Sequence, residues 1–146
     1  MRRILIATDG SPSAAEAASV GITLASEQGA EVTFVHVVTD AAALPSHDDE
    51  AAINAAAELA RETGLHPDVV IVSGDAVDEI VAYADTIDAN MIIVGSRGRN
   101  AVTSAPLGNV SGGVLDEARR PVLVVPRTPQ RRELVSNLTS QTRSEA

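Results

Sequence analysis

Five short apolar runs alternate with segments of helical periodicity along this 146-residue chain. The runs span residues 3–8, 31–38, 68–73, 91–95 and 121–125, and the helices predicted between them span about 12–28, 47–63, 75–88 and 109–119. Strands that are apolar on both faces are typical of parallel sheets covered by helices on both sides. The alternation therefore predicts a single α/β domain with an open parallel sheet.

Polar residues at the ends of the helical segments support these boundaries. Ser11 followed by Pro12 fits the start of the first helix, although Ser13 could form a capping box one step later. Ser46 precedes the acidic first turn of the second helix. Arginines are predicted in the last turn of the fourth helix, where the helix dipole favours positive charge.

The composition excludes several classes of protein. There is no cysteine, so disulfides, zinc–thiolate sites and thiol catalysis are absent. The net charge is −9 and every basic residue is an arginine, which disfavours nucleic-acid binding and fits a protein adapted to a salty cytosol. Simple compositional drift is the alternative explanation for this charge.

The ends of the chain predict its location and its domain limits. The first residues lead directly into a strand, and no apolar run has the length of a membrane span. We therefore expect a cytoplasmic protein that binds no membrane. Residues 1–126 form the predicted domain, and residues 127–146 form a polar tail that we expect to be disordered.

A glycine-rich segment after the fourth strand has the features of an anion-binding loop. Gly95 and Gly98 permit positive φ and close backbone approach, and Gly108 precedes the N-terminus of the fourth helix. Hydroxyl, amide and guanidinium donors lie beside these glycines, namely Ser96, Arg97, Arg99, Asn109 and Ser111. An alternative is that the glycines only form turns and helix caps.

Asp9 follows the first strand and is a second candidate for ligand binding. In open α/β sheets, ligands bind at the carboxyl ends of the strands, where the strand order reverses. Asp9 could hold a ligand there, or its carboxylate could cap the first helix.

Four motifs in the same order make the chain resemble the universal stress protein family over residues 3–125. Thr8 to Ser11 reads Thr-Asp-Gly-Ser after the first strand, and the second strand ends in Val-His-Val-Val. The glycines at 95, 98 and 108 match the family's phosphate-binding spacing, and the last strand reads Pro-Val-Leu-Val-Val.

The resemblance implies a Rossmann-like sheet with the strand order 3-2-1-4-5. It also implies that ATP, with or without Mg²⁺, binds between the first and fourth strands. It implies that the first two strands contribute Ala7, Asp9 and Val37 to the site. It also implies contacts from the segment that links the fourth strand to the fourth helix, namely Val94, Gly95, Arg97, Gly98, Gly108, Asn109, Val110 and Ser111. Asn109 stands where the family usually has Ser or Thr, and Gly112 and Gly113 stand where it has better helix formers.

The hypothesis from these residues is an ATP-binding, dimeric, regulatory protein of the stress response, with no catalytic residue. The alternatives are a slow ATPase or adenylyl-transferring enzyme, and an interaction module without a nucleotide. The apolar strand 121–125 lies at the sheet edge in the implied order, so we expect a homodimer through it. His36 is interpreted as a packed strand residue, and no metal site is expected.

Overall fold

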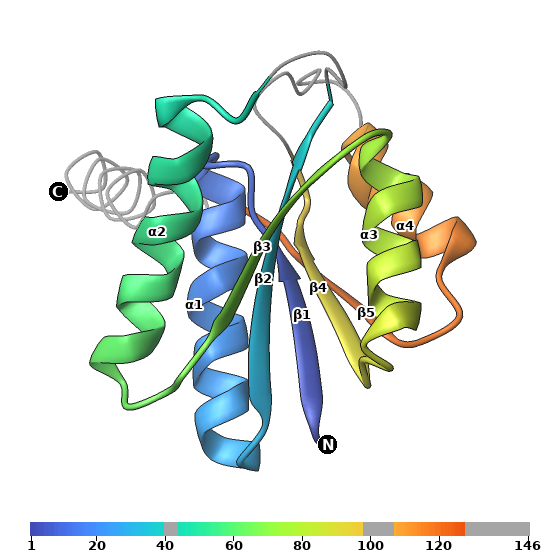
Figure 1. Cartoon of the computed structure of the whole chain (residues 1–146). Coiled ribbons are helices and arrows are strands. Elements are labelled where there is room, and N and C mark those ends of the chain that lie inside the picture. The colour runs from blue at the N-terminus through green and yellow to red at the C-terminus, as the bar shows by residue number, and fades with distance from the viewer. Residues whose placement is uncertain (40–43, 98–106, 128–146) are drawn as a thin grey trace, which may run out of the picture.

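The computed structural model describes residues 1–39, 44–97 and 107–127. Its strands are β1 (Arg3–Ala7), β2 (Glu31–Val38), β3 (Asp68–Ser73), β4 (Met91–Gly95) and β5 (Val122–Val125). Its helices are α1 (Pro12–Gln28), α2 (His47–Glu62), α3 (Ala76–Thr86) and α4 (Asn109–Glu117). The five strands form one sheet of order β3-β2-β1-β4-β5, which confirms the predicted fold class (Figure 1).

All neighbouring strands in this sheet are parallel. β1 lies in the centre and pairs with β2 on one side and β4 on the other, with Ile6 opposite Phe34 and Ile93. The chain therefore moves outward from β1 to β2 and β3, and then crosses back to β4 and β5. The point where the direction reverses lies between β1 and β4, as the resemblance implied.

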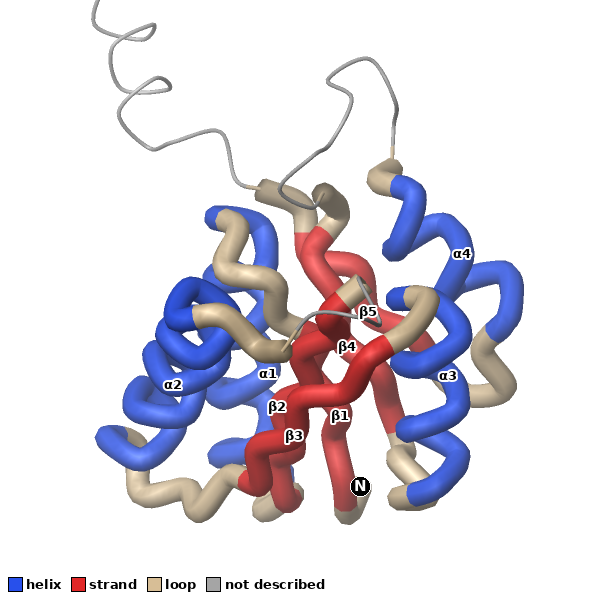
Figure 2. Tube along the Cα trace, turned by 45° about the horizontal axis from the view of Figure 1, so that its top comes forward, coloured by secondary structure: helices blue, strands red, loops and turns tan. Residues whose placement is uncertain are grey.

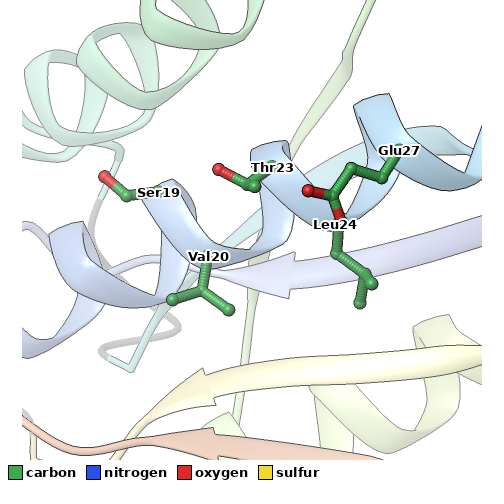
Figure 3. A pocket seen from close by; sticks show the side chains of 5 residues that line it. All are labelled: Ser19, Val20, Thr23, Leu24 and Glu27. Carbon is green, nitrogen blue, oxygen red and sulfur yellow. The ribbon is translucent and has the colours of Figure 1, made fainter.

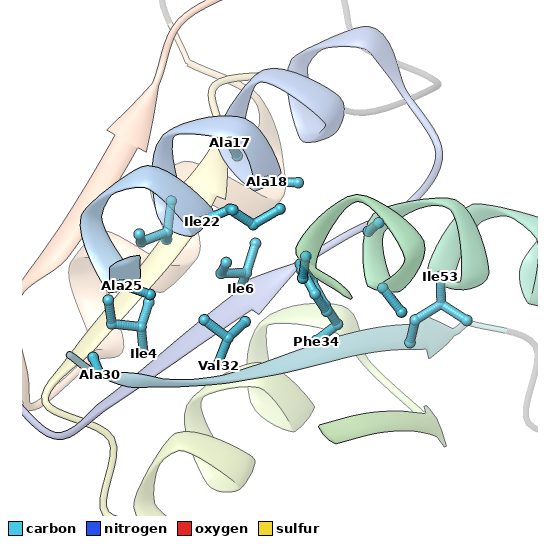
Figure 4. Close-up of a cluster of buried hydrophobic side chains, with 14 of the residues drawn as sticks. Ile4, Ile6, Ala17, Ala18, Ile22, Ala25, Ala30, Val32, Phe34 and Ile53 are labelled. Carbon is cyan, nitrogen blue, oxygen red and sulfur yellow. The ribbon is translucent and has the colours of Figure 1, made fainter. Parts of the chain in front are cut away.

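Helices cover both faces of the sheet, and each face has its own apolar cluster. α1 and α2 cover one face, and α3 and α4 cover the other (Figures 1 and 2). Ile4, Ile6 and Phe34 point toward α1 and α2, where they meet Ile22 and Ile53 (Figure 4). The residues between them along the strands, including Leu5 and Val35, pack toward α3 and α4.

Local hydrogen bonds explain where the helices begin. Ser11 caps α1, and its hydroxyl oxygen accepts from the backbone N–H of Ala14 at 3.1 Å, so the alternative capping box at Ser13 is not used. Ser46 caps α2 in a full capping box with Asp49, and Asp75 caps α3. The predicted helix starts are therefore confirmed.

The helix ends differ more from prediction. α3 ends at Thr86, and α4 ends at Glu117 without a basic residue in its last turn, so the prediction for its arginines was wrong. Arg120 instead reaches the end of α3, where its guanidinium donates to the carboxylate of Asp85 at 2.9 Å and to the carbonyl of Ala89. A tertiary ion pair of this kind has no local signal in the sequence.

None of the helices described is long and apolar enough to cross a membrane.

The two glycines in α4 lie in different surroundings. A Cβ on Gly113 would lie 2.6 Å from Cγ2 of Val77 in α3, whereas a Cβ on Gly112 would have no atom outside the helix within 4 Å. Gly113 therefore permits the close packing of α3 against α4. Gly112 has no comparable packing role.

We expect alanine to have opposite effects at these neighbouring positions. Gly112→Ala should raise the free energy of unfolding by about 0.5 to 1 kcal/mol, because alanine is the better helix former. Gly113→Ala should lower it by about 1 kcal/mol, because the clash with a stiff valine exceeds that gain. Urea unfolding of the two variants measures both changes, and equal shifts would contradict the packing explanation.

Candidate nucleotide site

The candidate site lies at the carboxyl end of the sheet, where the segments that follow β1 and β4 meet. Ser11 links the two segments, because its hydroxyl donates to the backbone carbonyl of Arg97 at 3.3 Å. Ser11 is buried although it is polar. The turn after β1 is thus attached to the loop after β4 across the switch point.

Asp9 organises the turn between β1 and α1. Its Oδ1 accepts from the backbone N–H of Ser11 at 2.9 Å, and Gly10 takes the left-handed conformation with φ of 80°. The helix cap itself is Ser11, so Asp9 supports the turn before the helix rather than capping it. The carboxylate is half-buried at the edge of the sheet.

Three buried serines join α1, β4 and α4 at this edge. The Ser13 hydroxyl oxygen accepts from the backbone N–H of Arg97 at 3.2 Å, and the carbonyl of Ser96 accepts from the N–H of Gly108 at 2.7 Å. The hydroxyl of Ser111 lies 3.1 Å from the same carbonyl. The start of α4 is therefore fixed beside the end of β4, and the Ser111 hydroxyl serves this attachment.

Gly95 is needed for close packing rather than for an unusual backbone conformation. A Cβ at this position would lie 2.7 Å from the carbonyl carbon of Ser13 and 2.8 Å from its carbonyl oxygen. Gly95 is not among the residues with positive φ, so the conformational freedom of this glycine is not used. The close approach is real, but its partner is the first turn of α1.

The N-terminus of α4 presents backbone donors at the same edge. Gly108 is extended, with φ of −69° and ψ of 163°, and no side chain caps the helix. The first-turn N–H groups of Asn109, Val110 and Ser111 have no acceptor within the helix, which is the usual property of a helix start. Asn109 and Val110 are exposed, so these positions are accessible.

The other residues predicted for the site lie in the sheet or in the loop after β4. The apolar cluster on the face covered by α3 and α4 includes Ala7, Val37 and Val94, of which Val94 is buried and the other two are partly buried. Arg97 is half-buried at the start of the loop after β4. Gly98 lies outside the described residues. The structure thus gathers the other predicted site residues at one edge.

His36 and Asp49 form a contact that sequence reasoning missed. His36 is buried, which agrees with its interpretation as a packed residue, and its Nε2 lies 2.6 Å from Oδ1 of Asp49. Three hydrogen bonds lower the pKa of Asp49 from its usual value of 3.8 to about 2. The bond from the backbone N–H of Ser46 has the largest effect, followed by those from His36 and the Ser46 hydroxyl. The signal available in the sequence was the acidic residue three positions after the cap Ser46.

The low pKa of Asp49 predicts a pH-dependent contribution to stability. Because the folded-state pKa lies below the unfolded value, ionised Asp49 stabilises the fold above pH 3.8, and this contribution is lost as the pH falls toward about 2. We expect Asp49→Asn to lower the melting temperature at neutral pH and the difference from wild type to shrink near pH 2. Thermal unfolding of both proteins tests this, with Asp48→Asn, on the exposed side of the same turn, as the control.

A shallow depression on the surface lies elsewhere and has a different lining. Ser19, Val20, Thr23, Leu24 and Glu27 line it, and all of them come from the middle and end of α1 (Figure 3). None of the predicted site residues takes part. The depression is therefore separate from the edge where β1 and β4 end.

An open parallel α/β sheet with a helix N-terminus at its switch point defines a class of proteins, and comparisons with known proteins identify the family within it. The model of the universal stress protein family matches residues 1–126. Universal stress protein YxiE of Bacillus subtilis is 30% identical over 144 residues, covering 84% of this chain and 97% of that protein. This chain belongs to the universal stress protein family.

Solved structures of the family have the same fold. A universal stress protein in complex with cAMP gives a TM-score of 0.71 at 24% identity, covering 85% of this chain and 95% of the other. A family member from Arabidopsis thaliana with AMP bound gives a TM-score of 0.69 at 20% identity, covering 88% of this chain and 94% of the other. At these identities the likeness establishes the fold.

Proposed function

We propose that this protein binds an adenine nucleotide, ATP foremost, between β1 and β4, and acts as a dimeric regulatory module of the stress response. The observation that carries the proposal is the attachment of the α4 N-terminus beside the end of β4, opposite the turn that contains Asp9. Structural relatives that were solved with cAMP and AMP support the choice of an adenine nucleotide.

The residues at this edge suit the two ends of a nucleotide. The partly buried Ala7 and Val37 offer apolar surface to the adenine ring, with the buried Val94 in the same cluster. The Asp9 carboxylate is an acceptor for ribose hydroxyls. The first-turn N–H groups of α4, at Asn109 to Ser111, suit the phosphates, because a helix start carries partial positive charge. The proposed loop around the phosphates, with or without Mg²⁺, is completed by Gly95, Arg97, Gly98 and Gly108.

Calorimetric titration of the purified protein at high salt tests this proposal. ATP should bind with measurable heat, and absence of heat with ATP, ADP and AMP would overturn it. Asp9→Asn should weaken ATP binding about tenfold, since an amide loses the charge of the carboxylate but keeps an oxygen for the Ser11 N–H. Asp75→Asn is the matched control, because that carboxylate also accepts a nearby N–H but caps α3 at the outer part of the sheet.

We also propose that the dimer forms through β5. This strand lies at the edge of the sheet, and Val122, Leu123 and Val124 are only partly buried in the single chain. An apolar edge strand with unpaired backbone groups favours pairing with a second chain. Leu115, on α4 beside this strand, is 43% exposed and extends the apolar surface.

A further inference from the structure

The imidazole of His36 bridges two elements at the carboxyl edge of the sheet. Its Nδ1 lies 2.7 Å from the carbonyl oxygen of Thr8, the last residue before Asp9, and its Nε2 lies 2.6 Å from Oδ1 of Asp49. The His36 side chain is buried, with 4% exposed, and the Asp49 side chain is 16% exposed. One ring thus connects the end of β1 to the first turn of α2.

The Thr8 carbonyl defines the protonation of one nitrogen of this ring. A backbone carbonyl only accepts hydrogen bonds, so Nδ1 must donate to Thr8. Nδ1 therefore carries a proton, and Nε2 faces the Asp49 carboxylate at 2.6 Å.

Groups from three elements surround the ring. Asp49 is the charged group that reaches the ring from α2, Thr8 lies beside the ring just after β1, and Ile71 is the register partner of His36 on β3. The other oxygen of Asp49 is held by the backbone N–H and the hydroxyl of Ser46, both at 2.8 Å. The carboxylate is therefore oriented by the capping box before it meets His36.

We propose that His36 is a positioning residue for the nucleotide site, because its Nδ1–H holds the Thr8 carbonyl and thereby the turn that carries Asp9. This inference rests on the proposed function. His36 touches no nucleotide in this proposal and acts through the backbone between β1 and α1. The first turn of α2 supports the site through the contact of Asp49 with His36, although no residue of this turn is a predicted ligand contact.

The protonation of the ring is tested by nitrogen NMR on the whole chain without a nucleotide. His47 and His66 are exposed and serve as internal references. We expect Nδ1 of His36 to carry a proton both in the wild-type protein and in Asp49→Asn. An unprotonated Nδ1 on His36 in the wild-type protein would overturn the inference.

The positioning role is tested by two substitutions that each retain one of the two hydrogen bonds. In His36→Asn the amide nitrogen takes the place of Nδ1 and still reaches Thr8, whereas in His36→Gln it takes the place of Nε2 and reaches only Asp49. We expect His36→Gln to weaken ATP binding about tenfold and His36→Asn to restore most of the affinity. His47→Gln, on the exposed start of α2, is the control and should bind as wild type does.

The outcomes separate this inference from the proposed function. A folded His36→Gln variant with wild-type affinity would overturn the positioning role while nucleotide binding stands. A wild-type protein that binds no nucleotide would overturn the proposed function, whereas the ring protonation is measured independently. If His36→Gln fails to fold, His36→Met replaces it, because methionine fills the buried position without donating a hydrogen bond to Thr8, and wild-type ATP affinity in that variant would overturn the positioning role.

Discussion

Replacing Gly95 with valine is expected to lower the free energy of unfolding by about 3 kcal/mol and to abolish nucleotide binding. The new Cβ would lie 2.7 Å from the carbonyl carbon of Ser13, and backbone atoms in the first turn of α1 cannot move aside as a side chain would. The displacement would also separate the Ser13 hydroxyl from the backbone N–H of Arg97, which it holds at 3.2 Å.

Urea unfolding and calorimetry with ATP measure the two effects of Gly95→Val. Gly112→Ala is the control for stability, because it adds a Cβ to a glycine at the same edge where no atom lies within 4 Å. A Gly95→Val protein that keeps wild-type stability would show that α1 and β4 are not in close contact. A protein that is destabilised but still binds ATP would show that the loop does not depend on this contact.

The second large effect is expected for Val124→Pro, which should convert the proposed dimer into a monomer. The carbonyls of Pro121 and Val125 accept from β4, so the alternate residues Val122 and Val124 direct their backbone groups away from the sheet. Proline at 124 removes an outward N–H that a second chain would need, and proline is tolerated on edge strands. Analytical ultracentrifugation measures the mass of both proteins.

The matched control places proline on the opposite edge of the sheet. The N–H of Gly74 donates to Val38, so Val69, an odd-numbered residue of β3, also directs its N–H outward. Val69→Pro should leave the dimer intact. A dimer that survives Val124→Pro would contradict pairing through β5. Lysine at 122 or 124 is a poorer probe, because both valines pack against the cluster under α3 and α4.

Much of the fold was predictable because its signals are local. Apolar runs correspond to β2, β3 and β4 with the predicted bounds, and Ser46 and Gly29 mark helix ends through their own backbone and side chains. The strand order came from the resemblance to the family, since strand order depends on pairing between distant segments. The errors lie at the end of α4, where Arg120 pairs with Asp85 of another helix.

The candidate site was likewise only partly predictable from the sequence. The sequence by itself determined which residues follow each strand, so Asp9, Gly95 and Asn109 could be chosen from their positions alone. Only the tertiary structure decided what these residues touch. Gly95 contacts Ser13 because α1 packs across β4, and His36 meets Asp49 because the N-terminus of α2 returns to the end of β2. Such contacts join residues that are distant in the chain, so their energies leave no periodic pattern in the sequence and exist only once the elements have packed.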